Sequence, residues 1–333
     1  MKAVAWLGTT QPSFEIAVET LSRLAGVWMS KTTLWRRHGE VAGQVEQQLA
    51  AEEQGLTDWG ADAEEEKERV PAQAAVKEHA SVSIDGSMIR IEGEGYREVK
   101  MVSVSEVEKA EPSSNGESKV GRAEGEEKLK LVHHSYRAVL GGKGTFEPGL
   151  RAELVRRRVM DAAEITSVND GAGWIWDLVG RYLPEGRAEV LDWSHAVQNL
   201  AKAAAAAFGE GAPEAQAWLA ERKTELWEGR VAAVGGALLR LPRRRGERGR
   251  LIRNVQEYVT QHASRMDYAR FRAEGRPIGS GTVESGGKNV VQSRMKRGGQ
   301  SWSSNGAKRM LAALGELHSG RWDCACRRLA QAA

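Results

Sequence analysis

The order of strand-like and helix-like segments between residues 81 and 208 limits the folds open to this chain more than any other feature. Three β-rich runs come first, at 81–91, 99–104 and 131–139. Helical and strand patterns then alternate through residues 149–163, 165–170, 174–182, 188–192 and 194–208. Strands followed by alternating helices and strands are typical of a sheet covered by helices. We therefore expect an α/β fold with a mixed sheet and flanking helices.

A long helical block interrupts this alternation. Residues from about 213 to 266 have an almost wholly helical pattern without a strand signal. We expect a helical insertion at about 210–266, inside a domain that spans residues 76–322. After the insertion we expect a glycine-rich turn at 275–281, helices at about 282–295 and 302–318, and a tail at 323–333.

The first 50 residues predict a helix-turn-helix segment. Apolar residues recur at helical spacing from about Pro12, Gly26 interrupts them, and Ser30 is a good N-cap for a second helix that runs toward Leu49. In DNA-binding proteins with this pattern, the second helix enters the major groove. A plain helical hairpin is the alternative. Five residues of the second helix are placed to meet phosphates and bases: Lys31, Thr32, Thr33, Arg36 and Arg37.

The net charge of +3 results from the cancellation of two opposite regions. Residues 46–68 carry nine acidic groups and one basic group, whereas residues 265–309 carry ten basic groups and three acidic ones. We interpret 51–75 as an acidic linker, either a solvated helix or a loop. The basic region indicates a polyanionic partner.

Cysteine content and hydropathy exclude several other classes of protein. The two cysteines, Cys324 and Cys326, allow neither a disulfide framework nor a four-cysteine zinc site. Apolar runs are short and rich in alanine, and no basic stretch followed by an apolar block opens the sequence. We therefore expect a protein of a reducing compartment, without a membrane partner.

Four acidic residues occupy positions where acids are otherwise unexpected. Asp85 interrupts a β run, Asp170 and Asp192 each end one, and Glu284 starts a helix among small residues. Ligands of α/β sheets bind at the carboxyl ends of strands. Clustered carboxylates repel one another unless cations neutralise them, and oxygen ligands suit Mg²⁺ or Mn²⁺. An ordinary helix N-cap is the competing interpretation, and it is strongest for Asp192.

Four motifs in this order resemble those of DDE transposases, specifically the bacterial ISKra4-type group related to Mutator-like elements. The motifs lie at residues 83–86 (SIDG), 170–176 (DGAGWIW), 191–196 (LDWSHA) and 277–285 (PIGSGTVES). The resemblance covers residues from about 81 to 322 and implies an RNase H-like catalytic domain with a helical insertion before the last acid.

Carried over to this sequence, the family's catalytic and metal-binding triad falls on Asp85, Asp170 and Glu284. The family's Asp-x-x-His motif matches Asp192 and His195, which could support the metal site or orient a DNA phosphate. Asp192 is the alternative second member of the triad. The resemblance implies Mg²⁺ or Mn²⁺, as two ions about 3.5 to 4 Å apart.

The implied activity is metal-dependent cleavage of double-stranded DNA at element ends, followed by strand transfer into target DNA. Such an enzyme acts as a homo-oligomer on DNA in the bacterial cytoplasm, associated with the nucleoid. Basic residues around the last acid form an expected surface for the DNA backbone: Lys288, Arg294, Lys296 and Arg297. No nucleotide cofactor is expected, because the phosphate-loop pattern fails at Thr282 and Asn289.

Two other functions fit the same residues. A transposase-derived protein that has lost catalysis would bind DNA as a repressor or inactive remnant. An RNase H-like nuclease would cleave DNA without a strand-transfer step.

Overall fold

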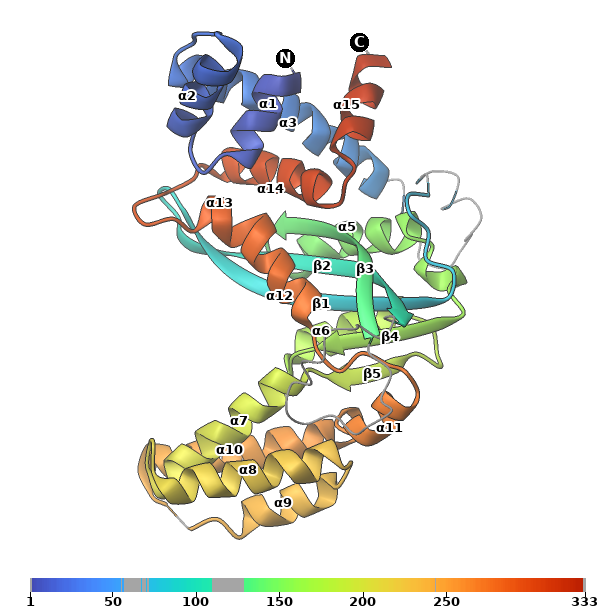
Figure 1. Ribbon diagram of the computed structural model, residues 1–333, viewed down its shortest axis with the longest axis vertical. Helices are drawn as coiled ribbons and strands as arrows, with labels where there is room; N and C mark the ends of the chain where they lie inside the picture. Colours follow the sequence, from blue (N-terminus) through green and yellow to red (C-terminus); the bar gives the residue numbers. More distant parts are fainter. Residues whose placement is uncertain are drawn as a thin grey trace, which may run out of the picture.

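The computed structural model describes residues 2–54, 56, 67, 70, 72–109, 129–242 and 244–331. Among these residues it contains one five-stranded sheet with helices on both faces (Figure 1). The expected α/β class with a mixed sheet is therefore confirmed.

The strand order in the sheet is β3-β2-β1-β4-β5. The first three strands, β1 (His79–Ile91), β2 (Gly95–Lys109) and β3 (Leu129–Leu140), form an antiparallel meander. The last two, β4 (Glu164–Asn169) and β5 (Ala188–Leu191), run parallel to β1. All five strand predictions are confirmed to within a few residues. Because β1, β4 and β5 are parallel, their carboxyl ends lie at one edge of the sheet.

Alternate residues of β1 pack into two different hydrophobic cores, as expected for a central strand. Val82 and Ile84 face a core shared with α5 (Lys143–Arg156), α6 (Gly173–Tyr182) and α7 (Trp193–Phe208). Ile89 and Ile91 face a second core, formed with the helical segments α12 (Gly281–Gly286), η3 (Gly287–Gln292) and α14 (Ser304–His318). The short α13 (Ser293–Met295) adds Met295 to this second core. The sheet is therefore buried between two helical layers.

The helix expected at 149–163 begins and ends earlier than the sequence indicated. It forms α5, whose second turn contains Pro148, and it is followed by the short 3-10 helix η1 (Val159–Asp161). A Cβ atom on Gly149 would lie 3.1 Å from Val139 on β3, so glycine allows the helix to approach the sheet.

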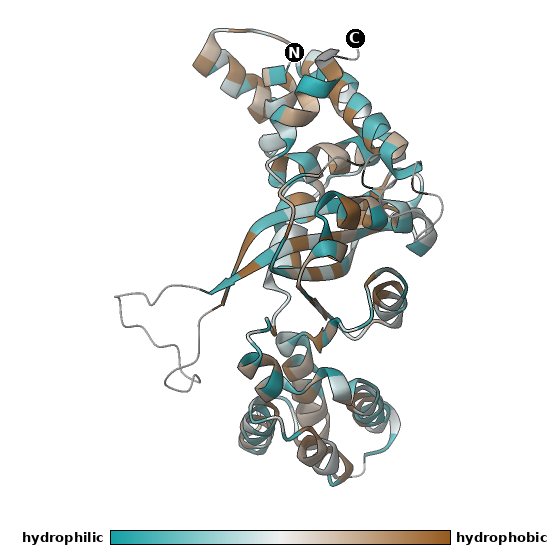
Figure 2. Cartoon of the chain, turned by 90° about the vertical axis from the view of Figure 1, so that its right-hand side faces the viewer, coloured by the Kyte–Doolittle hydropathy of each residue, from teal (hydrophilic) through white to brown (hydrophobic). Residues whose placement is uncertain are grey.

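The block of residues expected to be helical, about 210–266, is helical in the structure and contains no strand among the described residues. After α7 come α8 (Pro213–Trp227), α9 (Val231–Leu239), α10 (Gly246–His262), η2 (Ala263–Arg265) and α11 (Tyr268–Ala273). Leu226, Val234 and Ile252 join the core on the α6 face of the sheet. The insertion lies at the end of the molecule opposite the chain termini in both views (Figures 1 and 2).

The predicted helix, turn and second helix near the N-terminus are present as α2 (Phe14–Ala25) and α3 (Lys31–Gln54). Gly26 adopts a left-handed φ of 63° at the end of α2. The Ser30 hydroxyl accepts a hydrogen bond from the Thr33 N–H at 3.1 Å, so the expected N-cap is confirmed. An additional helix, α1 (Lys2–Thr10), precedes this pair. α1 and α3 pack on α14, α3 also contacts the C-terminal α15, and α2 packs on α1 and α3 (Figure 1).

The start of the expected acidic linker is part of α3, and its side chains there are not solvated. Glu53 forms an ion pair with Arg137 on β3 at 2.6 Å. Glu52 pairs with Arg156 on α5 and with Arg328 on α15. Most of the remaining acidic stretch, residues 57–66, 68, 69 and 71, lies outside the described residues.

The expected tail forms α15 (Trp322–Gln331), in which Cys326 is buried and Cys324 is half-buried. A buried network of ion pairs joins α15 to the rest of the molecule. It comprises six residues from four helices and the turn before α15: Glu52, Glu153, Arg156, Glu316, Arg321 and Arg328. Glu153 is fully buried and contacts both Arg156 and Arg321. The attraction of these two arginines outweighs burial and lowers the pKa of Glu153.

Candidate active site

The three aspartates found in the sequence lie in the three parallel strands or directly after them, and the register of β1 and β4 puts Asp85, in the middle of β1, level with Asp170. Asp85 lies in β1, Asp170 directly follows β4, and Asp192 directly follows β5 as the N-cap of α7. Glu284 comes from α12, which packs against β1, β2 and β3. Burial raises the pKa of Asp85, and the negative charges of Asp170 and Glu284 raise it further. Asp85, Asp170 and Glu284 are therefore close enough for their charges to interact.

Asp192 is 1% exposed, and hydrogen bonds occupy both of its carboxylate oxygens. Oδ1 accepts from the His195 N–H at 2.8 Å and lies 3.0 Å from His195 Nδ1. Oδ2 accepts from the Ser280 N–H at 2.6 Å and from the Ser280 hydroxyl at 2.9 Å. Burial alone would raise the pKa of Asp192, but the hydrogen bonds from His195 and Ser280 outweigh it and lower the pKa. Because its acceptor positions are filled, Asp192 acts as a structural clamp between β5 and the turn before α12.

The clamp fixes the segment that carries Glu284. The carbonyl of Ser280 accepts hydrogen bonds from the N–H groups of Val283 and Glu284, so it starts α12. A second bond from the Trp193 N–H to the Ile278 carbonyl, at 3.0 Å, holds the same turn against α7. The position of Glu284 thus depends on Asp192 through Ser280.

Glycines after Glu284 allow this helix to lie close to the sheet. A Cβ atom on Gly286 would lie 2.4 Å from the Tyr136 ring on β3, and one on Gly287 would lie 3.9 Å from Asp85 Oδ2. The helix widens into the π-helical turn η3 at this point. Such turns are frequent at functional sites.

His195 is oriented toward the acids by its bond to Asp192. That hydrogen bond raises the pKa of His195, and the charges of Asp170 and Glu284 raise it further against the opposing effect of burial. The imidazole therefore favours the protonated form more than a free histidine does. Its side chain is 36% exposed, so it is accessible from the site.

The side chains fit a divalent cation. Asp192, His195 and Glu284 each offer a ligand atom, and these atoms lie within 4.8 Å of one another. Among the described residues, Asp85 and Asp170 do not belong to such a group with Glu284. Asp85 and Asp170 each accept a local backbone bond on Oδ1, from Gly86 and Ala172 respectively. Their chemistry suits hard cations, because each of the two keeps acceptor capacity for a metal ion.

A wall of the site that the sequence did not indicate comes from the helical insertion. Tyr258 on α10 packs on Gly171, the residue after Asp170, and a Cβ atom there would lie 2.1 Å from Tyr258 Cε2. Burial raises the pKa of Tyr258 well above its usual value, and the charge of Asp170 contributes. In the sequence, the one signal for this close approach of Tyr258 is Gly171, the glycine next to Asp170.

The expected DNA-contacting residues lie on two surfaces. Along α3, Lys31, Thr32, Arg36 and Arg37 are exposed and Thr33 is half-buried, while Lys31 pairs with Glu15 and Arg37 with Glu40. Around η3 and α13, Lys288, Lys296 and Arg297 are exposed.

Arg294 departs from the expectation of an exposed basic surface. It is 3% exposed, and its guanidinium stacks on Phe14 at 4.7 Å and on Trp302 at 5.2 Å. Burial lowers its pKa to about 10, and the charge of Arg297 contributes. The helix face of Arg294 is covered by the N-terminal helices, which the sequence pattern of its own helix does not reveal.

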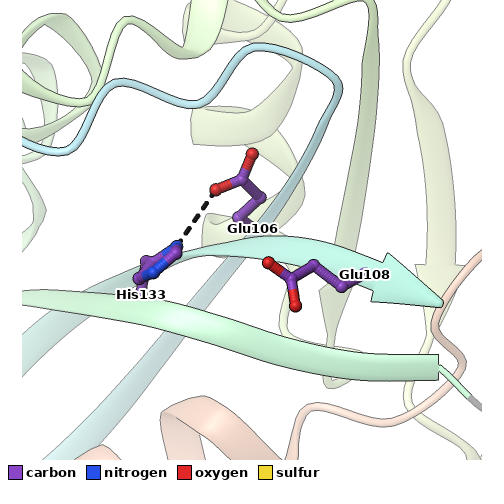
Figure 3. A group of neighbouring side chains, drawn as sticks. All are labelled: Glu106, Glu108 and His133. Atoms are coloured by element: carbon purple, nitrogen blue, oxygen red, sulfur yellow. Dashed lines mark hydrogen bonds and ion pairs between the residues drawn. The ribbon is translucent and has the colours of Figure 1, made fainter. Parts of the chain in front are cut away.

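A second group of potential metal ligands lies away from this site, on β2 and the edge strand β3. It comprises Glu106, Glu108 and His133, with His133 Nδ1 3.2 Å from Glu106 (Figure 3). His133 and Glu108 are exposed, and we assign no function to this group, because exposed acidic groups are common without a metal ion.

No protein-family model matches the chain, and no curated protein matches it either. In the part of the chain that the structure describes, no helix has the length and apolar character needed to cross a membrane.

Proposed function

We propose that the protein is a metal-dependent DNA transposase whose catalytic domain is RNase H-like. One observation carries the proposal: in a sheet with the order β3-β2-β1-β4-β5, Asp85 of β1 lies level with Asp170 after β4, and the helical segment that follows Glu284 packs over Asp85. A three-stranded antiparallel meander next to two parallel strands is the arrangement that the sequence resemblance implies. The cofactor is Mg²⁺ or Mn²⁺, and the partner is double-stranded DNA.

In this proposal, Asp85, Asp170 and Glu284 hold the cofactor, which when bound would activate a water molecule and stabilise the leaving oxygen. Asp192 and His195 have other roles than metal binding. Asp192 fixes the turn before Glu284, and His195, held by Asp192, presents an imidazolium to the phosphate oxygens of the substrate. The hydrogen bonds of Asp192 support this division, because its carboxylate already accepts four of them.

The potential ligand atoms of Asp192, His195 and Glu284 lie within 4.8 Å of one another, so an alternative metal site would use Asp192 in place of Asp170. The filled acceptor positions of Asp192 favour Asp170 as the second ligand. Metal binding measured by isothermal titration calorimetry distinguishes the two: Asp170→Asn should abolish binding of Mn²⁺, whereas Asp192→Asn should weaken it.

A cleavage assay tests the function. The substrate is a labelled duplex that carries the terminal inverted repeat flanking the coding region, incubated with Mg²⁺. We expect Asp85→Asn and Glu284→Gln to lower the cleavage rate at least 1,000-fold, on the order of the loss of a major electrostatic contribution to catalysis. Asp177→Asn is the matched control, because Asp177 is an exposed carboxylate on α6.

Three results separate the candidate functions. Cleavage followed by joining to a second duplex supports a transposase. Cleavage without joining identifies a nuclease, and DNA binding without any cleavage by the wild-type protein identifies a transposase-derived binding protein.

A further inference from the structure

A groove lies between α3 and the start of α14, far from the acidic site. Its volume is about 490 Å³, which is within the range of small-molecule and nucleotide pockets. Its walls are formed by residues of α3 on one side and by residues 302–310 on the other, with Phe14 of α2 at one end. Figure 1 shows α14 running beneath α3.

Two guanidinium groups line this groove without an anionic partner. Arg36 comes from α3 and Arg309 from α14, and among the described residues neither has a carboxylate within 4 Å. The acid in the lining, Glu40, is already paired with Arg37 at 3.1 Å. The groove is therefore positively charged.

Two glycines on α3, Gly39 and Gly43, leave room for the Arg309 side chain along the groove wall. A Cβ atom on Gly43 would lie 3.2 Å from Arg309 Nε, and one on Gly39 would lie 3.7 Å from Arg309 Nη1. These glycines are one helical turn apart, so they form a flat strip against which the guanidinium rests. The position of the Arg309 guanidinium therefore depends on residues of both α3 and α14.

A third cation lies directly behind the lining. Arg294 is 3% exposed and stacks on Phe14 and Trp302, both of which line the groove. Its Nε has no hydrogen-bond partner, and among the described residues no carboxylate lies within 4 Å. A buried charge without a counter-ion is costly. An anion in the groove would offset that cost.

Aromatic and amide side chains accompany the charges. Trp35 is 56% exposed at the groove, and the indole Nε1 of Trp302 is buried without a partner. Asn305 and Gln44 add hydrogen-bonding groups. Guanidinium groups next to aromatic rings are the combination that binds the phosphate and base of a nucleic acid strand.

We propose that this groove is a binding subsite for one nucleotide of the DNA strand, with its phosphodiester between Arg36 and Arg309 and its base against Trp35 and Trp302. The inference rests on the proposed function for the identity of the polymer but not on catalysis. It extends the expected DNA-reading surface of α3 to α14, which also packs on the sheet.

The test compares two variants on the same helix that remove one positive charge each. Arg309→Gln removes a groove cation, and Lys308→Gln removes its exposed neighbour, which does not line the groove. Both are made in the Asp85→Asn background, so that the probe stays intact. The probes are a fluorescein-labelled 20-base-pair duplex and a 12-nucleotide oligothymidylate, with binding measured by fluorescence anisotropy at fixed salt.

We expect Arg309→Gln to raise the dissociation constant of at least one DNA probe about 10-fold or more, and Lys308→Gln to raise it less than 3-fold. Equal losses in both variants would mean diffuse attraction only and would overturn the inference, as would no loss in either. Thymidine monophosphate is the competitor that distinguishes a strand from a free nucleotide. If it displaces the probes at micromolar concentration, the groove is a nucleotide site and the assignment to DNA is overturned.

This experiment can fail separately from the proposed function. If the wild-type protein cleaves DNA but Arg309→Gln binds normally, only the groove assignment falls. If no cleavage is ever found but Arg309→Gln selectively weakens binding, the groove assignment stands and the transposase proposal falls.

Discussion

Asp192 offers the sharpest test of how the site is assembled, because one substitution changes its hydrogen bonding without changing its size. In Asp192→Asn, one carboxylate oxygen becomes an NH₂ group. Whichever way the amide turns, that group faces a backbone N–H, of either His195 or Ser280, which cannot become an acceptor. A buried donor left without an acceptor costs about 1–3 kcal/mol, so the substitution should lower the free energy of unfolding by about that amount.

Two further variants should lower the free energy of unfolding by different amounts. Ser280→Ala removes the hydroxyl bond to Asp192 but keeps the backbone one, so it should cost about 1.5–3 kcal/mol, the value of one bond to a charged group. Asp177→Asn changes an exposed carboxylate that is 3.2 Å from Lys143 and should cost less than about 1 kcal/mol. The measurement is urea unfolding followed by far-ultraviolet circular dichroism at pH 7.

The clamp also has a pH signature. The pKa of Asp192 in the folded protein lies below its usual value of 3.8. The stabilisation by its ionised form is therefore complete above about pH 4 and is lost as the pH falls through the folded pKa. The difference between wild type and Asp192→Asn should shrink over the same interval. Equal stability of the two proteins at pH 7, or a larger cost for Asp177→Asn than for Asp192→Asn, would refute the clamp.

Two other predictions concern packing and acid sensitivity. Gly171→Ala places a Cβ atom 2.1 Å from Tyr258 and should lower the unfolding free energy by about 1–3 kcal/mol, measured by urea unfolding, whereas in a Tyr258→Ala background the same change should cost nothing further. Burial, with a smaller effect of Arg294, lowers the pKa of His38 to about 4. Because the unfolded chain binds this proton near pH 6.5, folding should lose about 3 kcal/mol between pH 6.5 and 4. His38→Leu should flatten the pH dependence of urea midpoints over that interval, and parallel curves for the two proteins would contradict the assignment.

The sheet and the acids at its edge follow from local signals in the sequence. Period-2 runs mark β1, β2 and β3, and the polar residues that end β4 and β5 mark the strand ends. The parallel register of β1 and β4, which pairs Val82 with Ser167, puts Asp85 level with Asp170, so their proximity depends on strand pairing and not on side-chain packing. Glu284 needed more, namely the resemblance of its motif to those of a known family.

The features that the sequence did not reveal depend on partners far along the chain. Asp192 is clamped by Ser280, 88 residues later, and Glu52 pairs with Arg328, 276 residues later. Arg294 looks like a surface cation in its own helix, because the rings that cover it belong to Phe14 and Trp302. Acidic and basic patterns alone cannot separate a solvated charge from a buried ion pair, since both obey the same helical spacing.

The buried ion-pair network between α3, α5, α14 and α15 has a consequence for how such a chain can change over evolution. Neutralising one member leaves an uncompensated charge in the interior, at a cost of about 3–5 kcal/mol. Glu153, between Arg156 and Arg321, is the most constrained, because it is fully buried and serves both. The N-terminal helices and the last helix are therefore inherited together, and the N-terminal helices could be exchanged for others only if the acid at Glu52 were kept.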